Sequence, residues 1–108
     1  AGVSTSAGLT VGGGFAATAI ATKSADYTTT VNDFTLFIDA SGGNVEITLI
    51  AAASYVGGIY TIIATSIAGG AATVDGLLNG AYTFTTPYDS IQVQSDGTNW
   101  YIINEYEQ

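Results

Sequence analysis

The chain has 108 residues, a length that fits one domain. Hydrophobic residues make up 47% and charged residues 9%, against roughly 25% charged residues in ordinary globular chains, so part of the apolar surface is expected to contact another chain. Nine acidic residues stand against Lys23 alone, and the net charge of −8 excludes the basic surface that nucleic acid or an anionic membrane requires.

Residues 1–24 are expected to form an extended arm or linker rich in Gly, Ala and Thr. The uncharged stretch 1–22 is long enough to span a bilayer, but small residues dominate it and make a poor membrane helix. It also lacks the basic region and the continuous apolar run of a signal peptide. Its larger apolar side chains are the candidates for anchoring the arm to a partner: Leu9, Val11, Phe15 and Ile20.

Residues 25–108 are expected to form one β domain, because runs rich in Thr, Val, Ile, Tyr and Phe alternate with Gly, Asn and Asp. No stretch shows a helical stripe, and residues 50–56 fit either a single helical turn or an irregular crossover. The pattern predicts an antiparallel β-sandwich or small barrel of about eight short strands. The expected strands are Tyr27–Val31, Phe34–Ile38, Val45–Leu49, Ile59–Ala64, Ala72–Asp75, Ala81–Thr85 and a final hairpin.

Side-chain parity predicts which residues of these strands face the core. Alternate residues of 34–38 are apolar, as are alternate residues of 45–49, so each strand can turn three apolar side chains toward one core. The run 59–64 is apolar at both parities, which is typical of a strand covered on both faces.

The stretch SDGTNWYII predicts a hairpin with Asp96 and Gly97 in its turn. A two-residue type I′ turn would place Val93 opposite Trp100, and a four-residue loop would keep the same parity. An even loop therefore directs Trp100 into the core, where a buried Trp covers about 150–250 Å² of apolar surface. Trp100, Asp96 and Gly97 are expected to anchor the last hairpin.

A resemblance to a known family covers residues 25–104. It is carried by ADYTTTVNDFTLFIDASGGNVEITL and ATVDGLLNGAYTFTTPYDSIQVQSDGTNWYIIN. These runs resemble β-structured domains of tailed-phage virion proteins, which include tail fibres, head fibres and capsid decoration proteins. In such domains a D-x-x-[IL]-x-[IV]-D strand precedes a glycine turn and a V-x-I-x-L strand, and an S-D-G-x-x-W-Y hairpin closes the domain. The chain departs from this pattern at Ile50 and Ala51, where such domains often have a proline.

The resemblance implies a non-enzymatic module of the virion, commonly a homotrimer, with an N-terminal segment that attaches it to the particle. Its partners would be further copies of itself and the major capsid protein or other virion proteins. The expected location is the capsid surface or a fibre.

The residue types agree with a non-enzymatic role, because His and Cys are absent and no catalytic residue or cofactor site can be assigned. Paired carboxylates can cleave a glycosidic bond, but the aspartates stand at predicted turns, where Asp caps its own backbone. Calcium is the one metal considered, and no EF-hand loop is present, so no metal site is predicted. Its loop candidates are Asp75, Asn79 and Asp89.

Several tyrosines are candidates for a subunit interface or for stacking against a cell-surface glycan, because aromatic rings suit both roles. The candidates are Tyr60, Tyr82, Tyr88 and Tyr101.

Two functions from different classes follow. The first is capsid decoration or cementing, or a head fibre, by a homotrimer whose arm reaches neighbouring shell subunits. The second is a receptor- or glycan-binding module of a tail fibre or adhesin. A chain that begins with Ala fits a short protein trimmed of its Met or a segment of a longer one. The short length favours decoration over a fibre.

Overall fold

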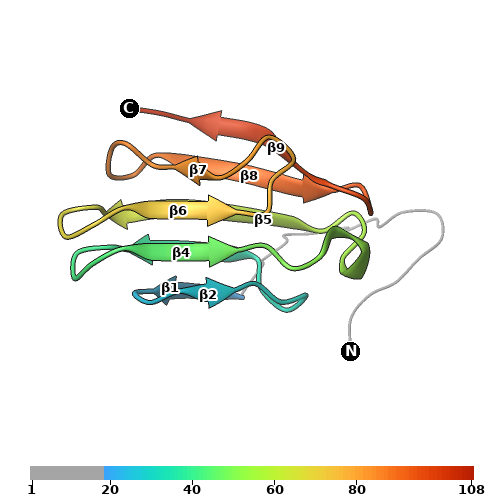
Figure 1. The fold of residues 1–108 in the computed structure, drawn as a ribbon, viewed down its shortest axis with the longest axis horizontal. Coiled ribbons are helices and arrows are strands. Elements are labelled where there is room, and N and C mark those ends of the chain that lie inside the picture. The colour runs from blue at the N-terminus through green and yellow to red at the C-terminus, as the bar shows by residue number, and fades with distance from the viewer. Residues whose placement is uncertain (1–18) are drawn as a thin grey trace, which may run out of the picture.

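The computed structural model describes residues 19–108, which form nine strands and one short 3₁₀ turn arranged as two packed sheets (Figure 1). The all-β prediction is therefore confirmed, and the sheets do not close into a barrel. In these residues no helix has the length and apolarity needed to cross a membrane. The strands are β1 (Ile20–Lys23), β2 (Tyr27–Thr28), β3 (Thr35–Asp39), β4 (Val45–Thr48), β5 (Ile59–Ser66), β6 (Ala72–Asp75), β7 (Tyr82–Thr83), β8 (Ser90–Ser95) and β9 (Trp100–Tyr106).

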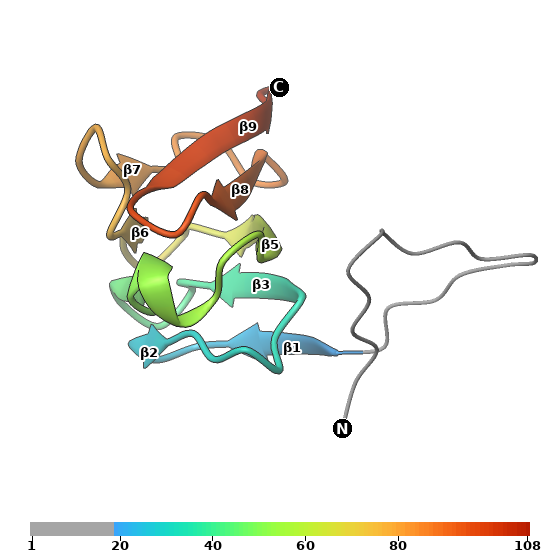
Figure 2. The same cartoon turned by 90° about the vertical axis from the view of Figure 1, so that its right-hand side faces the viewer.

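The first six strands alternate between the two sheets, so the chain winds as a coil that adds one strand to each sheet per turn (Figure 2). The five-stranded sheet has the order β1-β3-β5-β8-β9, and the four-stranded sheet has the order β2-β4-β6-β7. Neighbouring strands of successive turns are parallel, and only the pairs β5–β8, β6–β7 and β8–β9 are antiparallel. The prediction of an antiparallel sandwich is wrong for this coiled part.

The glycine-containing loops explain the difference. The loop after β3 carries the chain to the opposite sheet, where a hairpin turn would have kept it in the same sheet. The loops of successive turns then stack closely, since a Cβ atom at Gly69 would lie 2.0 Å from the carbonyl oxygen of Ser41. Period-two alternation looks the same in both arrangements, because it reports only that one face is buried.

The core lies between the sheets and follows the predicted parity. Leu36 and Ile38 of β3 are buried, Phe34 just before it is half-buried, and all three expected residues of the next strand are buried. Across the five-stranded sheet Leu36, Ile62 and Ile91 are register neighbours. The opposing row of the other sheet is Tyr27, Ile47, Val74 and Tyr82.

The ambiguous segment 50–56 is a crossover that contains a single 3₁₀ turn, Ala52–Ser54. The buried hydroxyl of Ser95 donates a hydrogen bond to the Ala52 carbonyl oxygen at 2.8 Å and ties this crossover to the end of β8. Ring contacts of Tyr55 with Tyr60 and Trp100, at centroid distances of 5.6 and 6.4 Å, fix its other end.

The final hairpin has a four-residue loop, residues 96–99, so the two-residue register is wrong and Ser95 pairs with Trp100. The even loop keeps the predicted parity, and Trp100 is buried with 2% of its surface exposed. The Asp96 carboxylate selects this loop, because its Oδ1 accepts hydrogen bonds from the backbone N–H groups of Thr98 and Asn99 at 2.9 and 2.8 Å. Gly97 takes a φ of +94°, which a side chain would disfavour.

The sheet begins within the segment expected to be a linker. Ile20–Lys23 forms β1 and pairs in parallel with β3, and the Lys23 ammonium lies 3.7 Å from the centroid of the Tyr27 ring. The remaining predicted anchors, Leu9, Val11 and Phe15, lie outside the described residues.

Candidate functional site

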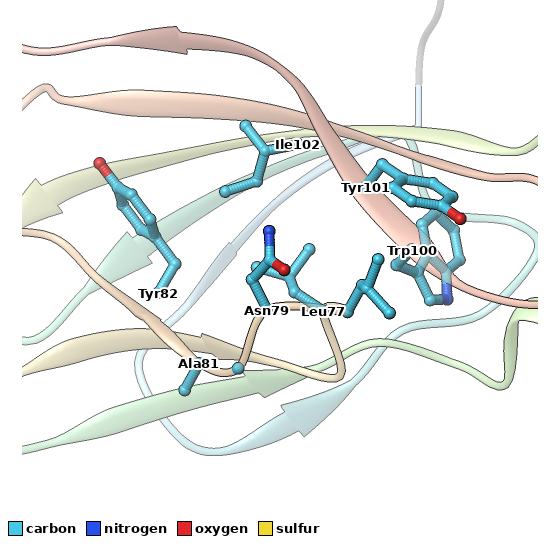
Figure 3. Close-up of a pocket in the computed structure, with 9 residues that line it drawn as sticks. Leu77, Asn79, Ala81, Tyr82, Trp100, Tyr101 and Ile102 are labelled. Atoms are coloured by element: carbon cyan, nitrogen blue, oxygen red, sulfur yellow. The ribbon is translucent and has the colours of Figure 1, made fainter.

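A pocket of about 300 Å³ opens between the two sheets at the end of the coil, where β7 and β9 are the last strands (Figure 3). One wall is the loop 77–81 with Tyr82, and the other is the start of β9, residues 100–102. The pocket exists because β9 continues beyond the short β7, so the five-stranded sheet is not fully covered at this end.

The loop wall is fixed by backbone contacts to β9. The Leu78 N–H donates to the Trp100 carbonyl oxygen at 3.0 Å, and the Gly80 N–H donates to the Leu77 carbonyl oxygen at 3.1 Å. Leu77 is buried and anchors the loop, whereas Leu78 is exposed. Both leucines line the pocket. Gly80 completes the turn with a φ of +99°, where a side chain would be strained.

Trp100 forms the floor of the pocket and is held from two sides. Its ring stacks on Tyr60 at a centroid distance of 5.1 Å, and its Nε1–H donates to the Ile50 carbonyl oxygen at 2.7 Å. Because Tyr60 covers one face of the indole, Trp100 is a packing anchor, as predicted. Tyr101 has the opposite parity to Trp100, so its ring, 38% exposed, lies on the outer face of the sheet beside Gln94 and Asp96.

Carboxylates set the electrostatics of the pocket mouth. The Tyr82 hydroxyl donates to Glu105 at 3.1 Å and to Glu107 at 3.3 Å. Burial and these two carboxylates raise the pKa of Tyr82 well above its ordinary value, so the phenol stays neutral. Sharing the site with Glu105 raises the pKa of Glu107. An acidic mouth disfavours phosphate, sulfate and carboxylate ligands.

The size and lining of the pocket admit a single sugar ring or one apolar side chain of another chain, since ligand pockets usually exceed ~300 Å³. Leu77, Ala81 and Ile102 give it an apolar surface, and the Asn79 amide and Tyr82 hydroxyl give it polar groups. Among residues 19–108 no three acidic, His or Cys side chains converge on a possible metal position.

Of the four candidate tyrosines, Tyr82 has its ring at this pocket (Figure 3). Tyr101 contributes to the β9 wall, but the parity of β9 turns its ring to the outer face of the sheet. Tyr88 lies apart, in the loop before β8, with a φ of +70° and 59% of its surface exposed. The proposed contact role of Tyr60 is wrong, because its side chain is buried and its hydroxyl donates to the Thr30 carbonyl oxygen at 2.6 Å.

The aspartates mostly act as turn residues, as expected. Oδ2 of Asp33 accepts from the Thr30 N–H at 2.8 Å, and Oδ1 of Asp39 accepts from the Ser41 N–H at 3.0 Å. Asp89 differs, since it is buried and its Oδ1 accepts from the Gln108 N–H at 2.8 Å. Of the three calcium candidates, Asn79 lines the pocket and Asp75 and Asp89 do not.

Comparisons with protein-family models, with curated proteins and with solved structures find no match. Sequence patterns did not predict Leu77 and Ile102 as pocket residues, and they predicted Asn79 only as a loop candidate for calcium. The adjacent leucines of GLLNG, residues 76–80, are the signal for a loop that carries a buried and an exposed apolar side chain.

Proposed function

We propose that this protein is a structural component of a tailed-phage virion that decorates or cements the capsid as a homotrimer. The resemblance of residues 25–104 to virion β domains gives the class, and the surface of the fold supports it. The observation that carries the proposal is the terminal strand β9, which supplies four of the nine large apolar or aromatic side chains exposed in the described chain: Tyr101, Ile102, Ile103 and Tyr106.

An edge strand of this kind is a site where another chain binds. β9 is seven residues long, and Glu105 is its single charged residue. Its pairing with β8 shifts register once, and beyond the Leu77–Trp100 bridge at its start its second side pairs with no described strand. Long apolar edge strands promote pairing with other chains unless charges, bulges or partners protect them. In a protein that assembles with other copies and with a capsid shell, such an edge strand serves as a contact surface.

The proposal is tested by locating the chain in purified phage particles. Quantitative mass spectrometry should find it at hundreds of copies per particle, and gold-labelled antibody should decorate the head. A few copies confined to the tail would contradict decoration and favour a fibre. Light scattering of the isolated protein should give the mass of a trimer, and a monomer at micromolar concentration would contradict the homotrimer.

A glycan-binding module is the second candidate, and the pocket is the observation that favours it. Asn79 and Tyr82 place polar groups beside the exposed apolar side chains of Leu78 and Ile102 around about 300 Å³, which suits a neutral sugar. On a glycan array, Ile102→Ala and Asn79→Ala should abolish any binding that the native protein shows. The control Tyr88→Ala changes an exposed tyrosine outside the pocket. Binding that survives both pocket changes, or no binding at all, contradicts this candidate.

A further inference from the structure

The outer face of the five-stranded sheet is a surface of the described chain that carries almost no charge. Side chains alternate along its strands, so the residues that do not point into the core form rows across this face. One row is Ile20, Thr35, Thr61, Gln92 and Asn104. The next row is Thr22, Phe37, Ile63, Ser90 and Tyr106, and a third is Ile59, Gln94 and Tyr101.

Only one carboxylate has outward parity on this sheet. Asp39 stands at the last position of β3, and its Oδ1 turns back to accept from the Ser41 N–H at 3.0 Å. Lys23 and Glu105 have the opposite parity and face the other sheet. Lys23 lies over the Tyr27 ring, and Glu105 accepts a hydrogen bond from Tyr82. The rows that cross the middle of the face are uncharged.

The outer face of the four-stranded sheet is acidic by comparison. Its register rows are Thr28, Thr48 and Asp75, and then Glu46, Thr73 and Thr83. Asp26 adds a third carboxylate at its edge, where it caps the Glu46 N–H at 2.9 Å. The two sheets therefore present faces of very different charge to their surroundings.

We infer that the outer face of the five-stranded sheet is the surface by which copies of this chain associate. The occupant is a second copy because a chain of net charge −8 repels itself, and like charges placed opposite each other cost several kcal/mol. This face is where two copies can meet without opposing carboxylates. Of the thirteen residues in these rows none is charged and six are aromatic or aliphatic, and interface cores are likewise depleted in charge.

The central strand β5 gives independent support. Ile59 and Ile63 point outward from it and stay half-buried, and no described strand or helix covers them (Figure 2). Strands with apolar side chains on both faces are typical of sheets that are covered on both sides. A second copy supplies the missing layer.

The face supports a contact of modest affinity. Five strands at ~4.8 Å spacing and about six residues at ~3.3 Å rise span roughly 500 Å². Each copy has one such face, so in a homotrimer the face is shared between two neighbours, and three faces bury about 1,500 Å² in all, or about 500 Å² for each pair of copies. Contacts of this size are smaller than most specific interfaces, so association is expected to weaken measurably on dilution.

The test uses the absence of cysteine in this chain, because one introduced thiol is then the only reactive one. Ser90→Cys places it between Ile63 and Tyr106 on the proposed interface, and Thr73→Cys places it at a comparable central position on the acidic face. At a concentration where the protein is oligomeric, maleimide should modify Ser90→Cys at least about tenfold more slowly than Thr73→Cys, because the reagent reaches it only in dissociated chains. Dilution should remove this difference.

A charge variant gives the second measurement. Phe37→Lys should shift light scattering toward the monomer mass, and its control Thr73→Lys should not. If Phe37→Lys does not fold, as judged by circular dichroism, the thiol experiment decides alone.

This inference rests on the proposed homotrimer, and the outcomes separate the two. A native protein that is a monomer at micromolar concentration overturns both. An oligomer in which Ser90→Cys reacts as fast as Thr73→Cys overturns the assigned face and leaves the homotrimer standing. Slow labelling of both thiols in the oligomer also contradicts the assignment, because it shows that the acidic face is covered as well.

Discussion

At the scale of single residues, Trp100 connects three parts of the chain that are distant in sequence. Its ring packs on Tyr60 of β5, its Nε1–H bonds the Ile50 carbonyl oxygen in the crossover, and its backbone carbonyl accepts from Leu78. The side chain joins the end of the coil to the crossover, and the backbone of the same residue joins them to the pocket loop. This explains why the only tryptophan stands in the last hairpin.

We expect Trp100→Ala to lower the free energy of unfolding by about 3–5 kcal/mol, the usual cost of removing a buried large aromatic side chain. Trp100→Phe keeps ring stacking but removes the bond to Ile50, so it should cost less. The exposed control Val31→Ala should change stability by less than about 0.5 kcal/mol. Urea unfolding followed by circular dichroism, at one protein concentration, measures all three variants. Equal losses for Trp100→Ala and Val31→Ala would contradict the anchoring role.

Asp96 gives a pH-dependent contribution to stability. Backbone hydrogen bonds from Asn99 and Thr98 lower the pKa of its carboxyl below the ordinary value. A carboxyl whose pKa is lower in the folded state stabilises the fold above the unfolded pKa of about 3.9, and this contribution disappears as pH falls through the folded pKa.

The variant Asp96→Asn keeps the acceptor oxygen and removes the titration. The native protein should therefore be more stable than Asp96→Asn at pH 6, and the gap should close as pH falls from about 4 toward 2. Urea midpoints measured across this range test the expectation, with Thr98→Ala as a control that keeps the backbone donor. A gap that stays constant with pH would contradict it.

At the scale of elements, β9 depends on contacts that are not part of its own strand pairing. It pairs with β8 on one side, and the Tyr82 hydroxyl of β7 bonds Glu105 from the facing sheet. At its end, the Gln108 N–H bonds the buried Asp89 carboxylate. These contacts keep the two sheets together at the open end, where the pocket lies.

We expect Tyr82→Phe to loosen this end without unfolding the rest. Hydrogen exchange of the β9 amides from residue 102 onward should become several-fold faster, because local opening controls the exchange of edge strands. Exchange in β3 and β5 should not change. The control Tyr88→Phe removes an exposed hydroxyl for which the structure gives no hydrogen bond. Unchanged β9 exchange in Tyr82→Phe would show that strand pairing alone holds this end.

At the scale of the whole molecule, charge is distributed unevenly between the two sheets. The outer face of the four-stranded sheet carries Asp26, Glu46 and Asp75, whereas the five-stranded sheet has Asp39 alone at its corner. In the proposed association, this asymmetry leaves the acidic face for solvent and the uncharged face for other copies. It also accounts for the composition of 47% hydrophobic and 9% charged residues, because the charged side chains are needed mainly on one of the two outer faces.

We expect the proposed self-association to persist in molar salt. An apolar contact does not weaken when charges are screened, and screening also reduces the repulsion between copies of net charge −8. Sedimentation at about 0.1 M and 1 M sodium chloride, where the Debye lengths are about 10 and 3 Å, should show equal or stronger association at the higher salt. Dissociation in 1 M salt would mean that ion pairs hold the oligomer.

Local sequence patterns predicted most of the features that depend on residues close together in the chain. Parity placed Leu36, Ile38 and Ile47 in the core, the even loop directed Trp100 inward, and the side chains of Asp33 and Asp96 bond turn backbone. Each of these features depends on residues close in sequence, so a single sequence contains the information.

Strand pairing and the site were decided by the tertiary structure. Period-two alternation states that one face of a strand is buried, but it does not state which strand lies beside it or in which direction. The sequence by itself determined an all-β chain with few charges and an inward tryptophan. The parallel coil, the pocket between the loop 77–81 and β9, and the uncharged outer sheet arise only when segments distant in sequence come into register, because their side chains share a surface only after the chain has wound upon itself.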